Sequence, residues 1–376
     1  MYRRVYFDNA ASSFPKPQSV VYAVQNILKT NTSNPGRSGH YMSSGIAKEV
    51  YSVRKKIADF FGTDETLTIF TQNATHAINL LFFGLLGRGD EVIISDLEHN
   101  AVLRPLHALK KRGVTFKIFE TGNKSVENCE HLITENTKLI FITGASNVTG
   151  ETLPVRQIAE VAKKHNVLFG IDTAQSAGVV SYDMQKDNID FICGTGHKSL
   201  LGIQGAGFLL MKQPIEIQPL IYGGTGSESL NANQPITFPE GLESGTISTP
   251  AIIGLGAAID FISQNSKYIY EKEKKLYSYA YEKLLKNEFI TVYSSEKFGV
   301  PTISFNVKGK PSESVCEYLS KKGVCLRGGF HCTLLAHQKL KTTDYGVCRA
   351  SFSPFNNTDE IDYMCSLLNS ERLSEI

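Results

Sequence analysis

Residues 167–175 read VLFGIDTAQ, and residues 189–198 read IDFICGTGHK. Each stretch starts with a short apolar run and passes directly into polar residues, with Asp172 in the first and Lys198 in the second. Apolar runs without clean alternation are typical of parallel strands that are covered on both faces of a sheet. Both stretches therefore predict buried strands that place polar side chains at their carboxyl ends.

The same pattern extends over much of the chain. Between residues 17 and 264, helical patterns alternate with the apolar runs LTIF, EVIIS, VTFKIF and KLIFIT. Such alternation predicts an α/β domain with a mainly parallel sheet over residues 17–264. From about residue 265 the chain reads as one long amphipathic helix, followed by segments typical of strands and further helices. We assign residues 1–16 and 265–376 to a smaller α+β domain.

The composition excludes several classes of protein. The chain has 376 residues, of which 41% are apolar and 20% charged, and its net charge is +2. This balance gives no reason to expect a nucleic acid as partner. No apolar run approaches the roughly 20 residues that span a bilayer, and the first residues lack the apolar core of a signal peptide. We therefore expect a cytoplasmic protein that does not enter the membrane.

The 7 cysteines give no sign of a metal site or a disulfide framework. They form no C-x-x-C pair, so neither a zinc ribbon nor a thioredoxin-like site is predicted, and we expect no metal. An odd number in a chain without a secretion signal argues against paired disulfides. Most are expected to be small buried hydrophobic residues.

Polar residues follow four of the predicted strands. In open α/β sheets, ligands bind outside the carboxyl ends of the strands. The residues concerned are Asp96, Glu98, His99 and Asn100, then Ser146, Asn147 and Thr149, then Asp172 and Gln175, and finally His197 and Lys198. Taken singly, Asp172 is better explained as a helix cap, and the others as ordinary loop or solvated residues. Their arrival at one rim favours a ligand site.

A carboxylate, a lysine and an imidazole on one rim suit pyridoxal phosphate. Its aldehyde forms a Schiff base with a lysine, and its ring nitrogen needs a carboxylate to stay protonated. A flat imidazole can stack on the ring. Its phosphate needs backbone N–H groups at a helix N-terminus together with hydroxyl groups. Residues 67–80, LTIFTQNATHAINL, predict a strand, a polar turn and a helix that starts near Ala74 and Thr75.

A family resemblance runs through nearly the whole chain. It rests on VYFDNAASSFPKP, NPGRSGH, EHNAVLRP, ASNVTG, IDTAQSAG, GTGHKSLLGIQGAG, ESGTISTP, RGGFHC and VCRASFSPFN, in this order. With these motifs the sequence resembles the class V aminotransferase family of fold-type I pyridoxal-phosphate enzymes, and within it the cysteine desulfurases of the SufS-like and selenocysteine lyase group. The resemblance implies a large α/β domain around a mainly parallel, seven-stranded sheet and a smaller α+β C-terminal domain.

The resemblance also implies roles for the rim residues. Lys198 would carry the cofactor as a Schiff base and later move protons on the substrate. Asp172 would pair with the pyridinium nitrogen, and Gln175 would hydrogen-bond the phenolic oxygen. His99 would stack on the ring and can act as an acid–base group. The residues that would hold the phosphate are Ala74, Thr75, Thr195 and His197.

One phosphate residue departs from the pattern of the family. SufS-type enzymes often carry two threonines in this loop, whereas the present chain reads NATHA. Ala74 can therefore supply only a backbone contact, and Thr75 keeps the hydroxyl. The departure weakens the phosphate assignment slightly and leaves the implied function unchanged.

Further residues are carried over for the substrate and for a subunit contact. Asn147 and Arg349 would bind the substrate carboxylate, and an arginine is suited to a bidentate grip. Arg37 and His40 would lie near the substrate entrance. Thr246 would reach the phosphate of a neighbouring subunit, which implies a homodimer.

In desulfurases of this family, a cysteine on the small domain attacks the substrate sulfur and becomes a persulfide, and alanine is released. Cys332 in RGGFHC matches that position, whereas Cys325 and Cys348 lie in predicted strands and are interpreted as packing residues. Cys332 lies 17 positions before Arg349, which resembles the short, ordered loop of the SufS-like group. The persulfide would then stay in a cleft and pass to an acceptor protein or a thiol. Adjacency in sequence alone does not place the His331 imidazole on the sulfur.

The sequence leaves alternatives open. The substrate is L-cysteine or L-selenocysteine, and a selenocysteine lyase need not depend on the thiol, because selenium leaves as the better anion. A transaminase has no evident use for Cys332. A cofactor-binding sulfur-relay protein with little turnover is a further alternative. We expect an L-cysteine desulfurase.

Overall fold

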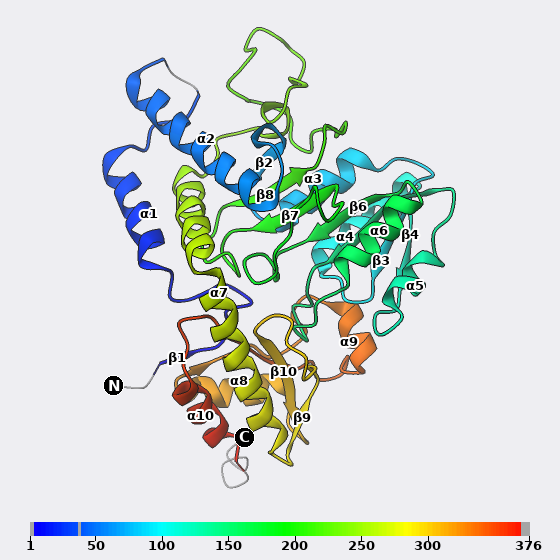
Figure 1. The fold of residues 1–376 in the computed structure, drawn as a ribbon, viewed down its shortest axis with the longest axis vertical. Coiled ribbons are helices and arrows are strands. Elements are labelled where there is room, and N and C mark those ends of the chain that lie inside the picture. Colours follow the sequence, from blue (N-terminus) through cyan, green and yellow to red (C-terminus); the bar gives the residue numbers. More distant parts are fainter. Residues whose placement is uncertain (1–3, 37–38, 370–376) are drawn as a thin grey trace.

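The computed structural model describes residues 4–36 and 39–369. A large sheet with its helices forms the upper unit in Figure 1, and a smaller unit of sheet and helix lies below it. The long helix α7 (Thr249–Leu285) runs through both units. The first strand of the chain and the last helix both belong to the lower unit.

Within the described residues, the large sheet has seven strands. Their order is β2 (Thr68–Thr71), β8 (Gly207–Met211), β7 (Phe191–Thr195), β6 (Leu168–Asp172), β5 (Thr137–Thr143), β3 (Glu91–Ser95) and β4 (Thr115–Phe119). Neighbouring strands are parallel except at β8, which is antiparallel to both β2 and β7. The predicted α/β class with a mainly parallel, seven-stranded sheet is confirmed, although β8 itself was not predicted.

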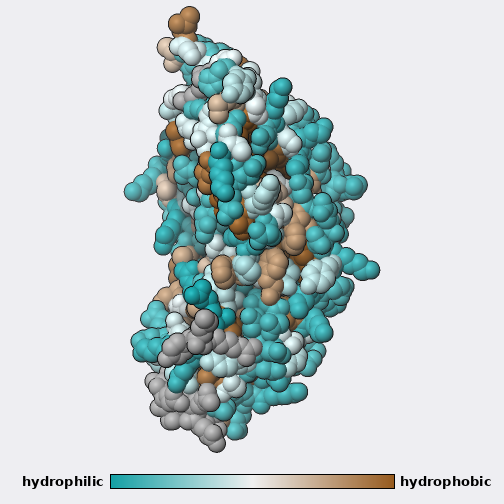
Figure 2. Space-filling view, turned by 90° about the vertical axis from the view of Figure 1, so that its left-hand side faces the viewer, coloured by the Kyte–Doolittle hydropathy of each residue, from teal (hydrophilic) through white to brown (hydrophobic). Residues whose placement is uncertain are grey.

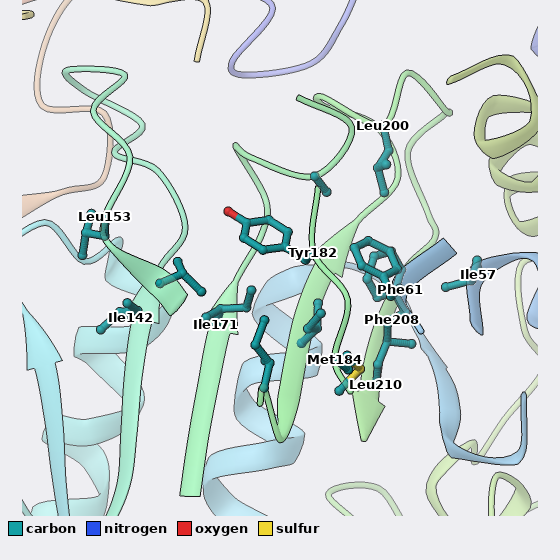
Figure 3. Packing of buried hydrophobic residues seen from close by; sticks show 14 of the residues in the cluster. Ile57, Phe61, Ile142, Leu153, Ile171, Tyr182, Met184, Leu200, Phe208 and Leu210 are labelled. Atoms are coloured by element: carbon teal, nitrogen blue, oxygen red, sulfur yellow. The ribbon is translucent and has the colours of Figure 1, made fainter. Parts of the chain in front are cut away.

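Helices cover both faces of this sheet. One face packs against α3 (Ala74–Leu85) and α4 (Asn100–Leu109), and the other against α2 (Tyr41–Phe61), α6 (Val155–Lys164) and the first half of α7. Figure 3 shows Phe61 of α2 beside Phe208 of β8, with ring centroids 5.4 Å apart. Burial on both faces explains why the strands read as nearly continuous apolar runs.

The remaining elements of the upper unit are peripheral. Helix α1 packs against α7, and α5 packs against α6 and β4. Short 3-10 turns complete the connections. The bounds are α1 (Gln18–Thr30), α5 (Ser125–Glu130), η1 (Glu65–Leu67), η2 (Lys110–Arg112) and η3 (Glu240–Leu242).

The lower unit has its own core. An antiparallel sheet contains β12 (Cys348–Ser351), β10 (Thr302–Val307) and β9 (Ile290–Val292), and β1 (Val5–Tyr6) pairs in parallel with β11 (Val324–Cys325). Helices α8 (Ser312–Lys321) and α10 (Thr358–Leu367) pack on these strands together with the second half of α7. The pairing of β1 with β11 ties the start of the chain to this unit. The domain limits at residues 16 and 264 stay a prediction.

Helix α7 starts earlier than its sequence pattern indicates. We predicted its start near residue 265, whereas it begins at Thr249 and has 37 residues. Glycine lowers helix propensity, but Gly256 of α7 allows close packing against α2. A Cβ on Gly256 would lie 2.5 Å from Cγ2 of Val53. The first part of α7 is therefore packed closely against α2, a tertiary contact that the sequence pattern did not indicate.

The segment after Cys332 contains helix α9 (Leu334–Leu340). The resemblance implied a short ordered loop here, and the helix within it was not predicted. Leu335 packs against the core around α3 and α4, and Ala336 is fully buried in the core on the opposite side of the sheet. Helix α9 therefore rests on the upper unit, although its neighbours in sequence belong to the lower one.

Candidate active site

The carboxyl ends of β3, β5, β6 and β7 lie side by side at one edge of the large sheet. Asp172 and Thr195 are the last residues of β6 and β7. The predicted rim residues follow these strand ends, so that a continuous row of polar groups is formed. The start of α3 lies at the same edge, because β2 runs parallel to β7.

Lys198 lies partly buried in the turn after β7. Burial lowers the pKa of its ammonium group, and the positive charges of Arg349 and Arg327 lower this pKa further, while Asp172 and the Cys332 thiol oppose the shift. All four groups therefore lie close enough to Lys198 to act on its charge. A lowered pKa makes the neutral, nucleophilic amine easier to form.

Asp172 has two contacts that matter for its charge. The carboxyl is only 4% exposed, and its Oδ1 accepts the N–H of Ala174 at 2.9 Å. Burial raises the pKa of Asp172, whereas the Ala174 hydrogen bond and Lys198 counteract this rise. The helix-cap interpretation is wrong, because no helix starts at Thr173; Oδ1 accepts its bond within a turn, and the carboxyl acts electrostatically on the lysine. Gln175, next along this loop, donates its Nε2 N–H to the Ala10 carbonyl at 3.0 Å.

His99 caps helix α4. Its Nδ1 accepts the N–H of Ala101 at 3.0 Å, which assigns the ring proton of the neutral form to Nε2. Burial, with added repulsion from Lys198 and Arg327, lowers the pKa of His99 to about 4. The imidazole at the rim is therefore neutral near pH 7.

Glu98 lies behind this imidazole and is fully buried. Its Oε1 accepts the Ser95 hydroxyl and the Thr143 N–H, the latter at 2.8 Å, whereas Oε2 has no hydrogen-bond partner in the described part of the chain. Burial raises the pKa of Glu98 to about 8, and the negative charge of Asp172 adds to the rise. We predicted Glu98 at the rim without giving it a role.

The N-terminus of α3 faces the same edge. Asn73 caps it by accepting the His76 N–H at 2.9 Å, Ala74 is buried and Thr75 is exposed. Gly207 at the start of β8 lies against this turn, since a Cβ there would be 2.6 Å from the Asn73 backbone. The first backbone N–H groups of such a helix attract anions.

Two polar atoms near this helix end are buried without a partner among residues 4–36 and 39–369. They are the Thr195 hydroxyl and Nδ1 of His197. Burial, together with Lys198 and Lys16, lowers the pKa of His197 to about 4. A pocket of about 600 Å³ lies beside His197, and exposed Thr246 lines it too. These atoms are able to bind an oxyanion.

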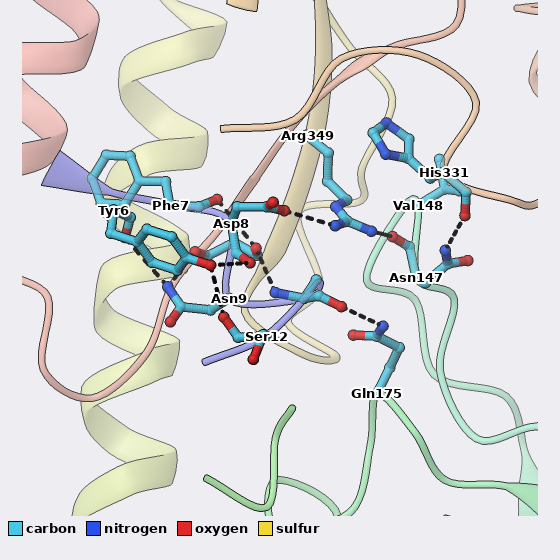
Figure 4. Close-up of polar contacts among 12 residues, drawn as sticks. Tyr6, Phe7, Asp8, Asn9, Ser12, Asn147, Val148, Gln175, His331 and Arg349 are labelled. Carbon is cyan, nitrogen blue, oxygen red and sulfur yellow. Dashed lines mark hydrogen bonds and ion pairs between the residues drawn. The ribbon is translucent and has the colours of Figure 1, made fainter. Parts of the chain in front are cut away.

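Arg349 lies on β12 and is only 1% exposed. Figure 4 shows its guanidinium between the Asp8 carboxylate and the Asn147 carbonyl, each 3.0 Å from a terminal nitrogen. Its Nε is buried and has no partner in the described segments. A guanidinium with one unused edge is suited to a carboxylate.

Asn147 uses its side chain to hold the cysteine loop. Its Nδ2 donates to the His331 carbonyl at 2.8 Å, and its Oδ1 accepts the Thr333 hydroxyl at 2.7 Å (Figure 4 shows the first of these bonds). We predicted Asn147 as a ligand of the substrate carboxylate. That role stays a prediction, and the amide has a structural role that we did not foresee.

Cys332 is exposed, and its backbone adopts the left-handed region with φ +58°. Its carbonyl accepts the N–H of Asn100 at 2.8 Å. Because Asn100 directly follows His99, this bond anchors the backbone of Cys332 next to the residue that carries the rim imidazole. Cys332 and His99 therefore lie on opposite units of the molecule and meet at one site.

His331 does not activate this thiol through a bond visible here. Its ring is 2% exposed, and Nε2 contacts the Val347 carbonyl at 3.0 Å. The ring also stacks on His337 with centroids 6.1 Å apart. Burial, with repulsion from Arg349, lowers the pKa of His331 to about 2. The imidazole therefore supports the loop as a neutral donor.

The described part of the chain gives no contact that supports a role for Arg37 or His40 at the substrate entrance. Arg37 lies outside the described residues. His40 is exposed at the start of α2, where its Nδ1 accepts the Ser43 N–H at 3.2 Å. This contact caps the helix, so the structure gives His40 a local role.

The other cysteines are less accessible than Cys332. Cys348 is fully buried, and its thiol donates to the Ser312 carbonyl at 3.4 Å. Cys325 lies at the end of β11 and is half-buried. Both positions agree with the packing roles expected for them.

Two charged residues of the site, Asp8 and Arg327, were not predicted from the sequence. Asp8 forms the ion pair with Arg349, and Arg327 forms backbone hydrogen bonds with Arg349 and acts on the charges of Lys198 and His99. Both residues lie inside motifs that carried the resemblance, namely FDNAAS and RGGFHC. Their place within these motifs could have identified both residues as candidates for the site.

The described residues offer neither a metal site nor a membrane-spanning helix. They contain no group of three or more histidine, cysteine, aspartate or glutamate side chains that could hold a metal ion. No helix among them is long and apolar enough to cross a membrane.

Comparison with known proteins places the chain in a family. The model of the class-V aminotransferases matches residues 5–364. A protein described as a probable cysteine desulfurase from Methanothermobacter thermautotrophicus is 30% identical over 383 residues, covering 99% of this chain and 94% of its own length. A second, from Halalkalibacterium halodurans, is 32% identical over 382 residues, with 98% and 93% covered.

A solved structure gives the same result. The apo structure of a cysteine desulfurase from Thermococcus onnurineus is 29% identical, covers 99% of this chain and 95% of its own, and superposes with a TM-score of 0.92. The match in fold therefore extends over both units. This chain belongs to the class-V aminotransferase family, whose members depend on pyridoxal phosphate.

Proposed function

We propose that the protein is a pyridoxal-phosphate-dependent L-cysteine desulfurase, which releases L-alanine and keeps the sulfur as a persulfide on Cys332. The observation that carries this proposal is the anchoring of the exposed Cys332 to the rim, through the bond from the Asn100 N–H to the Cys332 carbonyl, at a place where Cys332 acts on the charge of Lys198. A transaminase has no use for a thiol at this position. The relatives described as cysteine desulfurases support the same assignment.

The residues present fit the cofactor. The buried Thr195 hydroxyl and His197 Nδ1 lack partners among the described residues, and they lie near the N-terminus of α3. These groups would hold the phosphate, with Ala74 contributing its backbone and Thr75 its hydroxyl. Asp172 would face the ring nitrogen, Gln175 the phenolic oxygen and His99 the ring. When bound, the cofactor supplies an electron sink that weakens bonds at the substrate carbons.

Lys198 would hold the cofactor and move the proton at the substrate Cα. Its lowered pKa favours the neutral amine that both steps require. His99, neutral with a proton on Nε2, can donate that proton at the reacting edge of the site. Burial of these groups also keeps water from competing for the same protons.

Arg349 would bind the substrate carboxylate. Its Nε is unpartnered and Nη2 holds Asp8, so an incoming carboxylate can use the Nε edge while Asp8 keeps the guanidinium in place. Asn147, fixed to the cysteine loop, would contribute a second contact. The Cys332 thiolate then forms a bond to the substrate sulfur as the Cβ–S bond breaks, and the electron pair of that bond stays with the carbon skeleton until it is protonated.

The proposal also includes the oligomeric state, the sulfur acceptor and the location of the protein. We infer a homodimer because Thr246 and the pocket of about 600 Å³ lie open at the phosphate end. Figure 2 shows apolar side chains among polar ones on one face of the upper unit, and Leu28 and Tyr41 of α1 and α2 are 57% and 86% exposed. A thiol or an acceptor protein would collect the sulfur. A cytoplasmic location is also proposed.

Product analysis tests this function. The holoenzyme is given L-cysteine or L-selenocysteine, and alanine, sulfide and selenide are measured for wild type and Cys332→Ala. We expect alanine from L-cysteine and a loss of about 10²-fold or more in the variant. Full activity of the variant with L-selenocysteine alone would instead indicate a lyase, and 2-oxo acid dependence a transaminase. A yellow protein that turns over neither substrate would indicate a relay protein.

A further inference from the structure

Helix α9 connects the reactive thiol to the outer strands of the large sheet. It begins two residues after Cys332 and carries Lys339 near its end. Its apolar side rests on the upper unit through Leu335 and Ala336. The thiol and the upper unit are thus joined by one short rigid element.

Lys339 makes a compact set of contacts at that edge. Its Nζ donates to the Thr121 carbonyl at 2.6 Å and to Oδ2 of Asp96 at 3.1 Å, and it also contacts the Thr121 hydroxyl. Asp96 in turn accepts the backbone N–H of Thr121 at 3.2 Å and its hydroxyl at 2.5 Å. The three residues therefore form one hydrogen-bonded cluster, which we call the α9 clamp.

Two residues of the α9 clamp, Asp96 and Thr121, directly follow strands of the large sheet or lie close behind them. Asp96 directly follows β3 and Thr121 follows β4, so both lie at the carboxyl edge that also bears His99 and Asp172. The side chains of Lys339 and Asp96 are only 27% and 15% exposed. A pair that is shielded in this way is less weakened by water than a pair on the open surface.

The backbone conformation of the cysteine loop at His331 and Cys332 requires contacts that hold it in place. His331 and Cys332 are consecutive non-glycine residues with φ of +48° and +58°. This left-handed backbone is unfavourable for residues with a Cβ and persists only where surrounding contacts impose it. On the side before α9, the contacts come from Asn100 and Asn147. At the far end of α9, the polar contact to the upper unit comes from Lys339.

We propose that Lys339 is a positioning residue for Cys332, because the α9 clamp fixes the helix that sets the place of the thiol against the rim. This inference rests on the proposed function only where turnover is concerned. The position of the thiol itself is a property of the fold, and it can be measured without any turnover.

The test compares Lys339→Met with Lys321→Met in the holoenzyme. Lys321 is a matched control, since its amine pairs with Glu317 one helical turn away, with both side chains about 70% exposed. Alkylation of Cys332 by iodoacetamide is followed by mass spectrometry of its peptide. We expect the rate to rise threefold or more in Lys339→Met, and kcat for L-cysteine to fall about tenfold with KM within twofold. Lys321→Met should leave all three values unchanged.

Two further variants make the result decisive. Lys339→Arg can still donate to Asp96 and Thr121, so it should restore the alkylation rate and kcat to within about twofold of wild type. Asp96→Asn removes the charge of the clamp and should act in the same direction as Lys339→Met but less strongly. It serves in place of Lys339→Met if that variant does not fold.

Several outcomes would overturn the proposal. Equal alkylation rates and kcat values for Lys339→Met and Lys321→Met would show that α9 stays in place without the α9 clamp. Loss of the cofactor absorption in Lys339→Met would show a general structural role instead. Full L-cysteine turnover by Cys332→Ala would refute the proposed role of the thiol, while the alkylation comparison would still decide the role of Lys339.

Discussion

The rim of the large sheet and the cysteine loop position their reactive groups in different ways. Asp172 and Thr195 are the last residues of strands that are buried on both faces, so the sheet itself fixes them. Cys332 lies in a left-handed turn without regular structure, and its place depends on contacts with Asn100 and Asn147. The rim residues are fixed by their own strands, whereas the loop is fixed by contacts with distant parts of the chain. Substitutions in the rim and in the loop should therefore have separable effects on activity.

Loss of the central amine should give the largest effect. Lys198→Ala removes the group that holds the cofactor, and we expect activity to fall by about 10³-fold or more. The visible absorption of the lysine-bound cofactor should vanish. Lys212→Ala is the control, because its amine lies 3.5 Å from Asp190 at the opposite edge of the sheet. An unchanged absorption band in Lys198→Ala would refute the assignment.

Substitution of Arg349, which contacts Asn147 at the rim, should give the second largest loss of activity. Arg349→Lys cannot offer the Nε edge, so we expect kcat/KM for L-cysteine to fall about 10²-fold, mainly through KM. Steady-state kinetics with cofactor-saturated protein measures this. Asp8→Asn keeps a hydrogen-bond acceptor beside the guanidinium and should cost less than about fivefold. A larger loss in Asp8→Asn than in Arg349→Lys would contradict the proposed grip.

A substitution that displaces the cysteine loop should lower stability and activity without changing the binding of the cofactor at the rim. Gly346 has φ +61°, and a Cβ there would lie 2.5 Å from the backbone of Gly329, so Gly346→Ala must displace the turn before Cys332. We expect the free energy of unfolding to fall by roughly 1–3 kcal/mol and activity about tenfold, with cofactor absorption retained. Chemical denaturation measures the first quantity.

Gly309→Ala separates backbone strain from contact. Its φ is +73°, and nothing lies within 4 Å of the added Cβ. It should therefore lose stability through strain alone and keep full activity. An equal loss of activity in both glycine variants would mean that the close approach at Gly346 is not what matters.

A buried acid behind the rim should give the smallest change in activity. Burial raises the pKa of Glu98 to about 8, so the folded protein keeps a proton that the unfolded chain releases near pH 4.5. Stability is then lost as pH rises from about 4.5 to about 8, by on the order of 2–4 kcal/mol. Glu98→Gln should remove this slope and leave activity near pH 7 within about threefold. Denaturation at several pH values measures it.

The control for this titration is an exposed acid. Glu317→Gln should leave the pH dependence of stability as it is in wild type, apart from a small loss of its surface pair with Lys321. A slope that persists in Glu98→Gln would assign the titration to another group. Glu273, also buried and with a pKa raised by burial to about 8, is the first alternative.

The rim was predictable because strand burial leaves a strong mark on sequence. Apolar runs such as EVIIS and KLIFIT identified strands, and the residue after each run is at the carboxyl edge whatever the rest of the fold does. Strand β8 escaped prediction although it is fully buried, and it is the antiparallel member of the sheet. The start of α7 at Thr249 was also not predicted, and this part of the helix packs closely on α2 through Gly256 and Val53.

The loop was less predictable because its contacts join distant parts of the chain. Sequence pointed to Cys332 but gave Asn147 only a substrate role, whereas its amide bonds the His331 carbonyl and the Thr333 hydroxyl. Helix α9 and the contacts of Lys339 were not predicted at all. Each of these contacts closes a long stretch of chain, so no local pattern records it.

The sequence by itself determined the fold class and the polar rim with Lys198 and Asp172, because these follow from residue type and from position next to buried strands, which are local properties. The prediction of Cys332 came from the family resemblance of RGGFHC. Only the tertiary structure decided which groups act on one another: Asp8 on Arg349, and Asn100 on the Cys332 carbonyl. Charge and hydrogen bonding act through space, and folding alone brings these partners within reach.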